Sequence, residues 1–324
     1  MTESPPPAWE RAVLEKLALK SLEEQRRSRQ WSALFKLLWF GFTFLVFAAL
    51  MGWVGRSSDG EKAGIGKHTA LVDLKGVIGV EAKASADKMI PALNQAFKDK
   101  NTQGVVLRIN SPGGSPVQSG YINDEIKRLR AKYPSIPLYV VVQDLCASGG
   151  YYVAVAADKI YVDKASLVGS IGVIMSGFGF TGTMEKLGVE RRAYTAGENK
   201  DFLDPFAPEN PKQKEFAKQM LSEIHQQFIG TVKAGRGTRL KETPDMFSGL
   251  IWTGARSIEL GLADELGSQD YVAREVIKAE RVVDFTPDEN YLEQFSKRLG
   301  AEAGASFARS FAASLARGTS VGEH

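Results

Sequence analysis

The chain has 324 residues, a net charge of +3, a hydrophobic content of 44% and a charged content of 24%. These values are ordinary for a globular protein, and so small a net charge, with no cluster of Lys and Arg in the predicted folded region, gives no indication of a nucleic-acid partner. One cysteine, Cys146, excludes an intrachain disulfide, and three histidines (His68, His225 and His324) leave few candidates for a metal site or a Ser-His-Asp triad. No cofactor is expected.

The N-terminal region predicts a membrane anchor. We expect residues 1–33 to form a cytoplasmic tail and residues 34–54 a transmembrane signal-anchor helix, since this apolar run matches the roughly 20 residues that span a bilayer and contains only one charge, Lys36. Basic residues precede the span and few follow it closely, so the positive-inside rule places the N-terminus in the cytoplasm and the rest of the chain outside. The alternative is a cleaved signal peptide, whose apolar region is normally shorter, about 7 to 15 residues, and nearer the start.

A linker and a folded domain follow the anchor. Residues 55–68 are rich in Gly, Ser and charge and predict the linker, and residues 69–285 predict the catalytic domain. In its first half, strands are expected at 69–74, 104–110 and 138–142, with helices at about 85–99 and 117–133. This alternation predicts βαβ units and therefore a layered α/β fold with a mostly parallel sheet.

The segment Leu138–Ala157 predicts a buried strand, a tight turn at residues 146–150 and an apolar helix, which together present Ser148. Ser148 would then lie at a helix N-terminus, where unpaired N–H groups and the helix dipole favour negative charge, such as the oxyanion of acyl transfer. A short ASGG motif is also common in structural turns and N-caps. The functional interpretation therefore depends on the surrounding chain.

The second half of the domain is expected to continue the pattern with shorter elements. We expect strands at 159–162 and 191–195, a glycine-interrupted apolar segment at 167–175, a helix from Asn210 to Gly235, a short helix to Leu260, a last strand after Asp264 and a helix at 271–279, followed by an amphipathic helical tail over 286–324. The long helix carries a stripe expected to pack in the core: Phe216, Met220, Ile224, Phe228 and Val232. His225 is expected at the border of this stripe.

Two glycine-containing turns follow the ends of predicted parallel strands, at Gly113-Gly114 and at Ser148-Gly149-Gly150. Ligands bind at this edge of open α/β sheets. If the two strands are neighbours, the N–H groups of Gly114 and Gly149 can converge about 3 Å from the Ser148 hydroxyl, which is the geometry of an oxyanion hole. The first turn could instead hold a phosphate, but neither a Walker lysine nor a dinucleotide fingerprint is present.

A serine nucleophile needs a base, and a lysine is the natural substitute where histidines are scarce. The pKa of a lysine must fall from about 10.4 to about 7 to 8 for the amine to act at neutral pH, and desolvation must supply most of that change. By residue type alone Lys200 is indistinguishable from the other basic residues, and a solvated surface lysine is the default. The neighbouring Asp201 would favour a charged amine and is expected to face elsewhere.

Five stretches, in order and at specific spacings, carry a family resemblance: NSPGGS at Asn110–Ser115, CASGGYYVAVAADKI at Cys146–Ile160, VGSIGVI at Val168–Ile174, AGENKD at Ala196–Asp201 and WTGARSIELGLADELG at Trp252–Gly267. From about Ala70 to Gly267, the sequence resembles the short form of the signal peptide peptidase A (SppA, protease IV) family of membrane-bound serine peptidases with a Ser/Lys dyad. NSPGG or ASGG alone also suits the Clp protease proteolytic subunit and the crotonases.

The resemblance implies a Clp/crotonase-like fold and a role for each site residue. Ser148 would be the nucleophile and Lys200 the general base. Ser170 would hydrogen-bond and orient the lysine, and the N–H groups of Gly114 and Gly149 would form the oxyanion hole.

The resemblance also implies partners and a location. Long family members carry two tandem copies and combine serine and lysine from different copies, whereas one copy is present here. Lys200 of one subunit is therefore expected to complete the site around Ser148 of its neighbour in a ring or dome-like homo-oligomer. The expected substrates are signal peptides and other extended apolar peptides, hydrolysed on the extracytoplasmic (periplasmic) side of the bacterial cytoplasmic membrane, with the anchor in contact with lipid.

Two other functions use the same fold. A crotonase-type acyl-CoA enzyme shares the oxyanion architecture without a serine nucleophile, but a domain outside the cytoplasm would meet little CoA. A non-catalytic membrane scaffold is the third possibility, and retention of the serine, the lysine and both glycine turns argues against it. Cys146 is a conceivable nucleophile, but its place two residues before Ser148 predicts a side chain that points into the core.

Overall fold

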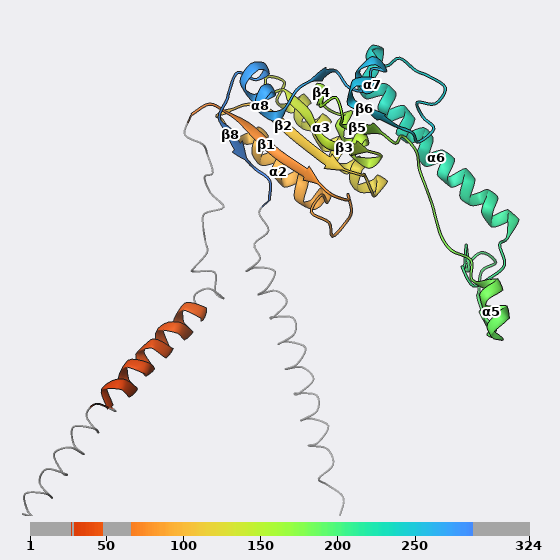
Figure 1. Ribbon diagram of the computed structural model, residues 1–324, viewed down its shortest axis with the longest axis horizontal. Helices are drawn as coiled ribbons and strands as arrows, with labels where there is room; N and C mark the ends of the chain where they lie inside the picture. Colours follow the sequence, from red (N-terminus) through yellow and green to blue (C-terminus); the bar gives the residue numbers. More distant parts are fainter. Residues whose placement is uncertain (1–26, 28, 48–65, 288–324) are drawn as a thin grey trace, which may run out of the picture. The chain divides into compact units, whose positions relative to one another are not determined.

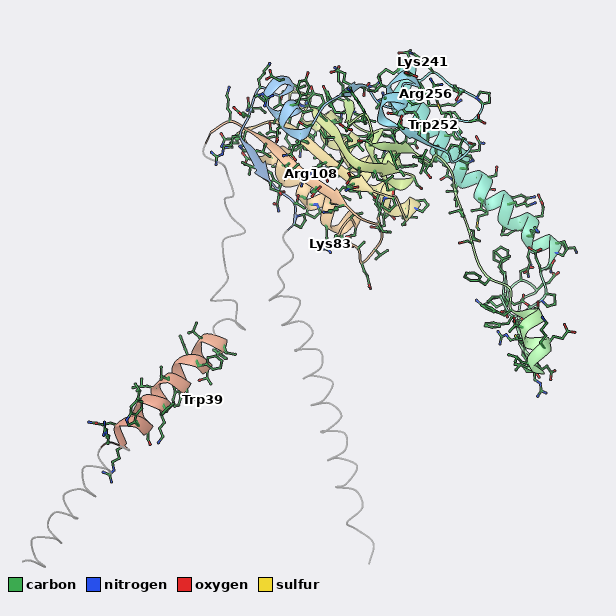
Figure 2. The ribbon with its side chains drawn as sticks, in the orientation of Figure 1. Trp39, Lys83, Arg108, Lys241, Trp252 and Arg256 are labelled. Atoms are coloured by element: carbon green, nitrogen blue, oxygen red, sulfur yellow. The ribbon has the colours of Figure 1, made fainter. Side chains whose placement is uncertain are left out.

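The computed structural model of the chain describes residue 27, residues 29–47 and residues 66–287 (Figure 1). The chain divides into a folded unit, residues 62–288, and a unit of flanking segments, and each is described by itself. In the flanking unit the described residues include a helix, Arg29–Phe47, whose 19 residues and mean hydropathy of 1.3 make it long and apolar enough to cross a membrane. Its apolar side chains, Trp39 among them, are exposed (Figure 2). The remainder of the predicted anchor and nearly all of both predicted tails lie outside the described residues.

A sheet of eight strands forms the centre of the folded unit, over residues 66–287. The strands are β1 (His68–Lys75), β2 (Thr102–Ser111), β3 (Leu138–Ala147), β4 (Lys159–Val162), β5 (Leu167–Gly169), β6 (Ile251–Thr253), β7 (Glu265–Leu266) and β8 (Val282–Asp284). Their order is β6-β5-β3-β2-β1-β8, with β4 beside β3 and β7 beside β4. Every pair is parallel except β5 with β6. The predicted layered α/β class with a mostly parallel sheet is confirmed.

The helices that connect the first strands lie together on one face of the sheet (Figure 1). In the folded unit the helical segments are α2 (Ala86–Lys98), α3 (Pro116–Lys132), α4 (Gly149–Ala154), α5 (Thr181–Leu187), α6 (Pro211–Arg236), α7 (Gly254–Glu259) and α8 (Gln269–Tyr271), with a 3₁₀ turn at Gly237–Arg239 and a π turn at Val272–Val276. The succession β1-α2-β2-α3-β3 gives the predicted βαβ units, because each helix returns the chain to the start of the next parallel strand.

The central strands β1, β2 and β3 are largely buried on both faces, which explains their nearly continuous apolar sequences. Alternate residues such as Val105 and Leu107 belong to the large core shared with α2, α3 and α4. The residue between them, Val106, belongs to a second cluster on the opposite face, together with Val141 and Val272. Because successive side chains of a strand point to opposite faces, they pack in two separate hydrophobic cores, one on each side of the sheet.

The second half of the domain differs from the prediction in several places, and the strand predicted at 191–195 is wrong. Residues 191–195 form no strand, because they are exposed and pair with no other segment in the described structure. The apolar segment 167–175 leaves the sheet after β5, since Gly169 and Ser170 have φ angles of +118° and +50°, which turn the chain away from the sheet. The helix predicted at 271–279 is instead α8 followed by the π turn. The strand predicted after Asp264 is β7, and β8 was not predicted.

The segment between β5 and α6 projects from the sheet with the amino-terminal part of α6, and carries α5 at its far end (Figure 1). We call residues 173–210 the arm. The predicted stripe of α6 is buried only at its carboxyl end, where Phe228 and Val232 enter the core, whereas Phe216 is 60% exposed. The helix is amphipathic along its length, but the sheet covers only part of it.

Candidate active site

Ser148 occupies a sharp turn between β3 and α4. Its φ of 51° and ψ of −123° lie outside the helical and strand regions, and it is the residue before the first helical residue, Gly149. Its N–H donates to the carbonyl of Gly169 at 2.8 Å, and its own carbonyl accepts from Tyr152 at 2.9 Å. Such a conformation is costly for a residue with a side chain, and strained positions of this kind cluster at functional sites. The turn thus presents a half-buried serine hydroxyl at a helix N-terminus, as the sequence predicts.

The turn at Gly113-Gly114 lies against Ser148 because β2 and β3 are neighbours, with Ser111 paired to Cys146. A Cβ atom on Gly113 would lie 2.6 Å from the nitrogen of Gly149 and 2.7 Å from the Cβ of Ser148. The φ angles of Gly113 and Gly114, +96° and +148°, also require glycine. Only a chain without side chains at this turn can approach the serine so closely.

The backbone N–H groups of Gly114 and Gly149 lie close together beside Ser148. The position of a Cβ on Gly149 is 3.2 Å from the nitrogen of Gly114. Among the hydrogen bonds of the described residues, neither N–H donates to an acceptor. Two adjacent N–H groups beside a serine hydroxyl are the arrangement that an oxyanion needs.

We call the place where the turn at Gly113-Gly114 meets the turn at Ser148 the corner. Two further serines lie next to it, one predicted from the sequence and one not. Ser170 adjoins the site because Gly169 accepts from Ser148, and it has its own positive φ of 50°. Ser119 was not predicted: it is fully buried on α3, and its Oγ lies 2.5 Å from the Cβ position of Gly149. Its only sequence signal is its place four residues after the N-cap Ser115, whose carbonyl accepts from it at 2.9 Å.

Trp252 packs against the backbone at Gly169, the residue before Ser170. Its Cδ1 lies 3.0 Å from the position of a Cβ on Gly169, so the indole occupies the space that a side chain there would need. Its indole nitrogen is buried and has no hydrogen-bond partner among the described residues. Figure 2 places Trp252 where α6 leaves the body of the protein.

Lys200 is not brought to this corner within one chain. It lies in the arm, is exposed, and its backbone N–H donates to Gly197 at 3.1 Å. The next residue, Asp201, accepts from Gln213 at 3.4 Å, and Gln213 is at the start of α6, the end that Figure 1 shows far from the sheet. Asp201 thus faces α6, and the amine of Lys200 lies away from Ser148 of the same chain.

The arm exposes an unusual number of apolar side chains. No residue of α5 is buried, and the exposed fractions reach 85% for Ile174, 81% for Phe178 and 92% for Tyr194. An internal cluster, in which Phe180 stacks on Phe206 with ring centroids 5.3 Å apart, holds the arm together. Large exposed apolar surfaces are common at sites of association between proteins.

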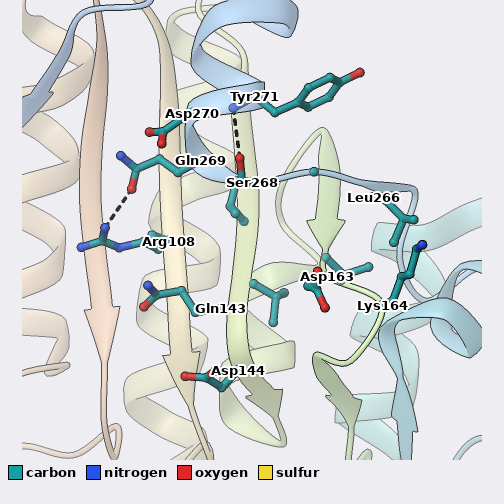
Figure 3. Close-up of a pocket in the computed structure, with 14 residues that line it drawn as sticks. Arg108, Gln143, Asp144, Asp163, Lys164, Leu266, Ser268, Gln269, Asp270 and Tyr271 are labelled. Carbon is teal, nitrogen blue, oxygen red and sulfur yellow. Dashed lines mark hydrogen bonds between the residues drawn. The ribbon is translucent and has the colours of Figure 1, made fainter.

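A cavity lies elsewhere in the folded unit. It has a volume of about 780 Å³ and lies over β2 and β3 beside α8 (Figure 3). Arg108 at its edge donates to Gln269 at 2.8 Å and to both carboxylate oxygens of Asp73 at 3.0 and 2.8 Å, so its charge is already compensated. None of the predicted site residues lines this cavity. No group of three or more His, Cys, Asp and Glu side chains in the described residues could hold a metal ion.

The model of peptidase family S49 matches residues 130–283 of the chain. A putative protease from Synechocystis is 30% identical over 204 residues, which cover 63% of this chain and 71% of that protein. A putative signal peptide peptidase SppA from Enterococcus faecium is 31% identical over 194 residues, 60% of this chain and 56% of that protein. The chain belongs to peptidase family S49.

Another relative has a higher sequence identity, but this chain matches a smaller part of that longer protein. A protein from Brucella melitensis named Na(+)/H(+) antiporter NhaA is 50% identical over 175 residues, which are 54% of this chain and 24% of that protein. The chain thus spans about a quarter of this relative and just over half of the Enterococcus protein.

Proposed function

We propose that this chain is a membrane-anchored serine endopeptidase with a Ser/Lys dyad. The observation that carries the proposal is the corner where the Ser148 hydroxyl lies at the start of α4 beside two N–H groups, those of Gly114 and Gly149, that donate to no described acceptor. Membership of family S49 supports the same conclusion.

In this proposal the reaction proceeds by acyl transfer. The Ser148 oxygen attacks the scissile carbonyl while the uncharged amine of Lys200 takes the hydroxyl proton. The negative charge that develops on the carbonyl oxygen is stabilised by the N–H groups of Gly114 and Gly149 and by the N-terminal end of α4. The lysine then gives its proton to the leaving amine, and a water molecule hydrolyses the acyl-enzyme with the lysine again as base.

We propose that Lys200 acts on Ser148 of a neighbouring copy in a homo-oligomer. The support is the position of Lys200 on a projecting arm whose apolar side chains are uncovered in the single chain. A second copy packed against the arm would bury those side chains and would remove the amine from water. Desolvation favours the neutral amine that a general base requires. Ser170, beside Ser148, would accept or donate the hydrogen bond that orients this amine.

The proposed substrates are extended apolar peptides, including signal peptides left in the membrane. Four exposed apolar side chains border the corner: Val77 and Val80 in the loop next to Gly114, and Val117 and Tyr121 at the start of α3. The apolar helix Arg29–Phe47 supports a single-pass membrane anchor. The proposed topology in the bacterial cytoplasmic membrane, with the N-terminus in the cytoplasm and the peptidase domain outside, rests on the basic residues that precede the span. The name of the Enterococcus relative agrees with this substrate class.

The test is hydrolysis of a synthetic signal peptide by the full chain in detergent. We expect turnover to fall by at least a thousandfold in Ser148→Ala and Lys200→Ala, because removing a member of a catalytic unit leaves little more than binding. Lys218→Ala, an exposed lysine on α6, is the matched control and should keep the full rate. Unchanged turnover in both site variants would rule out the dyad, and hydrolysis of an acyl-CoA in place of the peptide would favour the crotonase-type alternative.

A further inference from the structure

His225 on α6 contacts the backbone beside Ser170. Its Nε2 atom lies 3.1 Å from the carbonyl oxygen of Ile171, 54 positions earlier in the chain. Because a carbonyl oxygen can only accept, the hydrogen bond assigns the proton of the neutral ring to Nε2.

The bond completes a set of contacts that fix Ser170 in its left-handed conformation. The N–H of Ser170 donates to Leu250 at 2.7 Å, and its carbonyl accepts from Gly172 at 2.9 Å. Both are backbone bonds. In the described residues, His225 supplies the side-chain hydrogen bond to this turn, and it reaches the residue directly after Ser170.

The turn is also the last fixed point before the arm. The side chain of Ile171 is fully buried in the core, but residues 173–179 make no hydrogen bond within the described structure, and the next one runs from Phe180 to Pro205 at 2.7 Å. Without His225, the carbonyl of Ile171 would lose its hydrogen-bond partner. The segment that follows, residues 173–179, has no hydrogen bonds in the described structure that could hold the turn in its place.

We propose that His225 is a positioning residue for the reaction proposed above: it holds the Ile171 carbonyl and thereby aims the Ser170 hydroxyl at the general base. The imidazole touches neither substrate nor the reacting atoms. Its effect is geometric, and a shift of about 1 Å in a group that orients a catalytic base can cost roughly a hundredfold in rate. The inference rests on the proposed function, because it assigns Ser170 the task of orienting Lys200.

The experiment compares the full chain with His225→Leu, His225→Gln and His225→Asn, using a fluorogenic leucine-rich peptide amide in detergent. The leucine removes the donor and keeps most of the volume, the glutamine amide can reach the Ile171 carbonyl, and the asparagine amide is too short. We expect kcat to fall about tenfold or more in the leucine and asparagine variants with KM within about twofold, and the glutamine variant to recover most of the rate. Gln226→Ala, an exposed neighbour on α6, is the control.

A double-mutant cycle with Ser170→Ala shows whether His225 acts through Ser170. The proposal expects His225→Leu to slow the Ser170→Ala protein by less than about twofold. It is overturned if the leucine variant slows both backgrounds by the same factor, or if the asparagine and glutamine variants hydrolyse the peptide equally fast. If the leucine variant does not fold, as judged by circular dichroism, the asparagine and glutamine pair gives the same discrimination. Loss of the proposed function itself would appear separately, as full turnover in Ser148→Ala.

Discussion

The N–H of Ser148 donates a hydrogen bond of 2.8 Å to the carbonyl oxygen of Gly169. This bond joins the turn after β3 to the last residue of β5 and so places Ser148 next to Ser170. Both serines have positive φ angles, 51° and 50°, which residues with a side chain rarely adopt. The backbone at this corner is therefore held by its surroundings in a conformation that it would not take alone, as is common at functional sites.

The first prediction concerns the approach of the two turns. Gly113→Ala should lower peptide hydrolysis by at least about a hundredfold, because the added methyl would lie 2.6 Å from the Gly149 nitrogen and would displace the proposed oxyanion hole. Gly120→Ala, on α3 with open space around it, should keep its activity and gain about 0.5 to 1 kcal/mol of stability. Turnover and urea unfolding measure both effects, and normal turnover by the first variant would contradict the assigned geometry.

The second prediction concerns a buried ion pair at the end of α6. Arg236 is 1% exposed, and its two terminal nitrogens each donate to Asp264 at 2.9 Å. Asp264→Asn should lower the free energy of unfolding by about 3 to 5 kcal/mol at pH 7, since it leaves a buried charge without its partner. Lys233→Gln, also on α6, removes an exposed ion pair with Glu242 and should cost less than about 1 kcal/mol. Equal losses in the two variants would contradict this account.

The third prediction follows from the same pair and concerns pH. Burial alone would raise the pKa of Asp264, but its hydrogen bonds to Arg236 and the charge of that guanidinium hold the pKa below its ordinary value. A carboxylate with a lowered folded-state pKa adds stability above its unfolded-state pKa of about 3.9, and this stability is lost as the pH falls through the folded-state value. The stability difference between the parent chain and Asp264→Asn should therefore be constant from pH 7 to about pH 5 and shrink below about pH 4. Urea unfolding followed by tryptophan fluorescence tests this, and a difference that grows on acidification would refute it.

The fourth prediction concerns the single thiol. Cys146 is fully buried on β3, and burial raises the pKa of its thiol, so the reactive thiolate is suppressed. Iodoacetamide at pH 8 should leave Cys146 unmodified in the folded protein and label it after unfolding in urea, as measured by intact mass. Rapid labelling of the native protein would mean that this part of β3 opens, and would revive the thiol as a candidate nucleophile.

The fifth prediction concerns the proposed sharing of sites between copies. Ser148→Ala and Lys200→Ala should each be inactive alone. A mixture of the two, dissociated and reassembled in detergent, should regain up to about a quarter of the parent activity, because some neighbours then combine an intact serine with an intact lysine. Peptide turnover of the mixture against each variant alone is the measurement. Reassembled oligomers that stay inactive would place both members of the dyad in one chain.

Much of the fold follows from local sequence patterns. The apolar runs of β1, β2 and β3, separated by amphipathic helices, predict βαβ units, because parallel neighbouring strands need a long crossover and a helix is its usual form. The wrong strand at 191–195 shows the limit of such patterns. Alternating residues suit a strand only where another strand supplies hydrogen bonds, and the arm offers none in the described structure.

The sequence by itself determined the local conformation around Ser148: a buried apolar strand followed by Ala-Ser-Gly-Gly predicts a tight turn into a helix, and Gly113-Gly114 predicts a second turn after another strand, because glycine permits backbone angles that other residues avoid. Only the tertiary structure decided where Lys200 lies and which backbone carbonyl His225 contacts. Lys200 lies away from Ser148 because the amino-terminal part of α6 extends beyond the sheet and the arm goes with it (Figure 1). His225 bonds to Ile171 because α6 passes beside the turn that follows β5. Contacts between residues so far apart along the chain cannot be predicted from sequence periodicity, because three-dimensional packing determines them and local spacing does not.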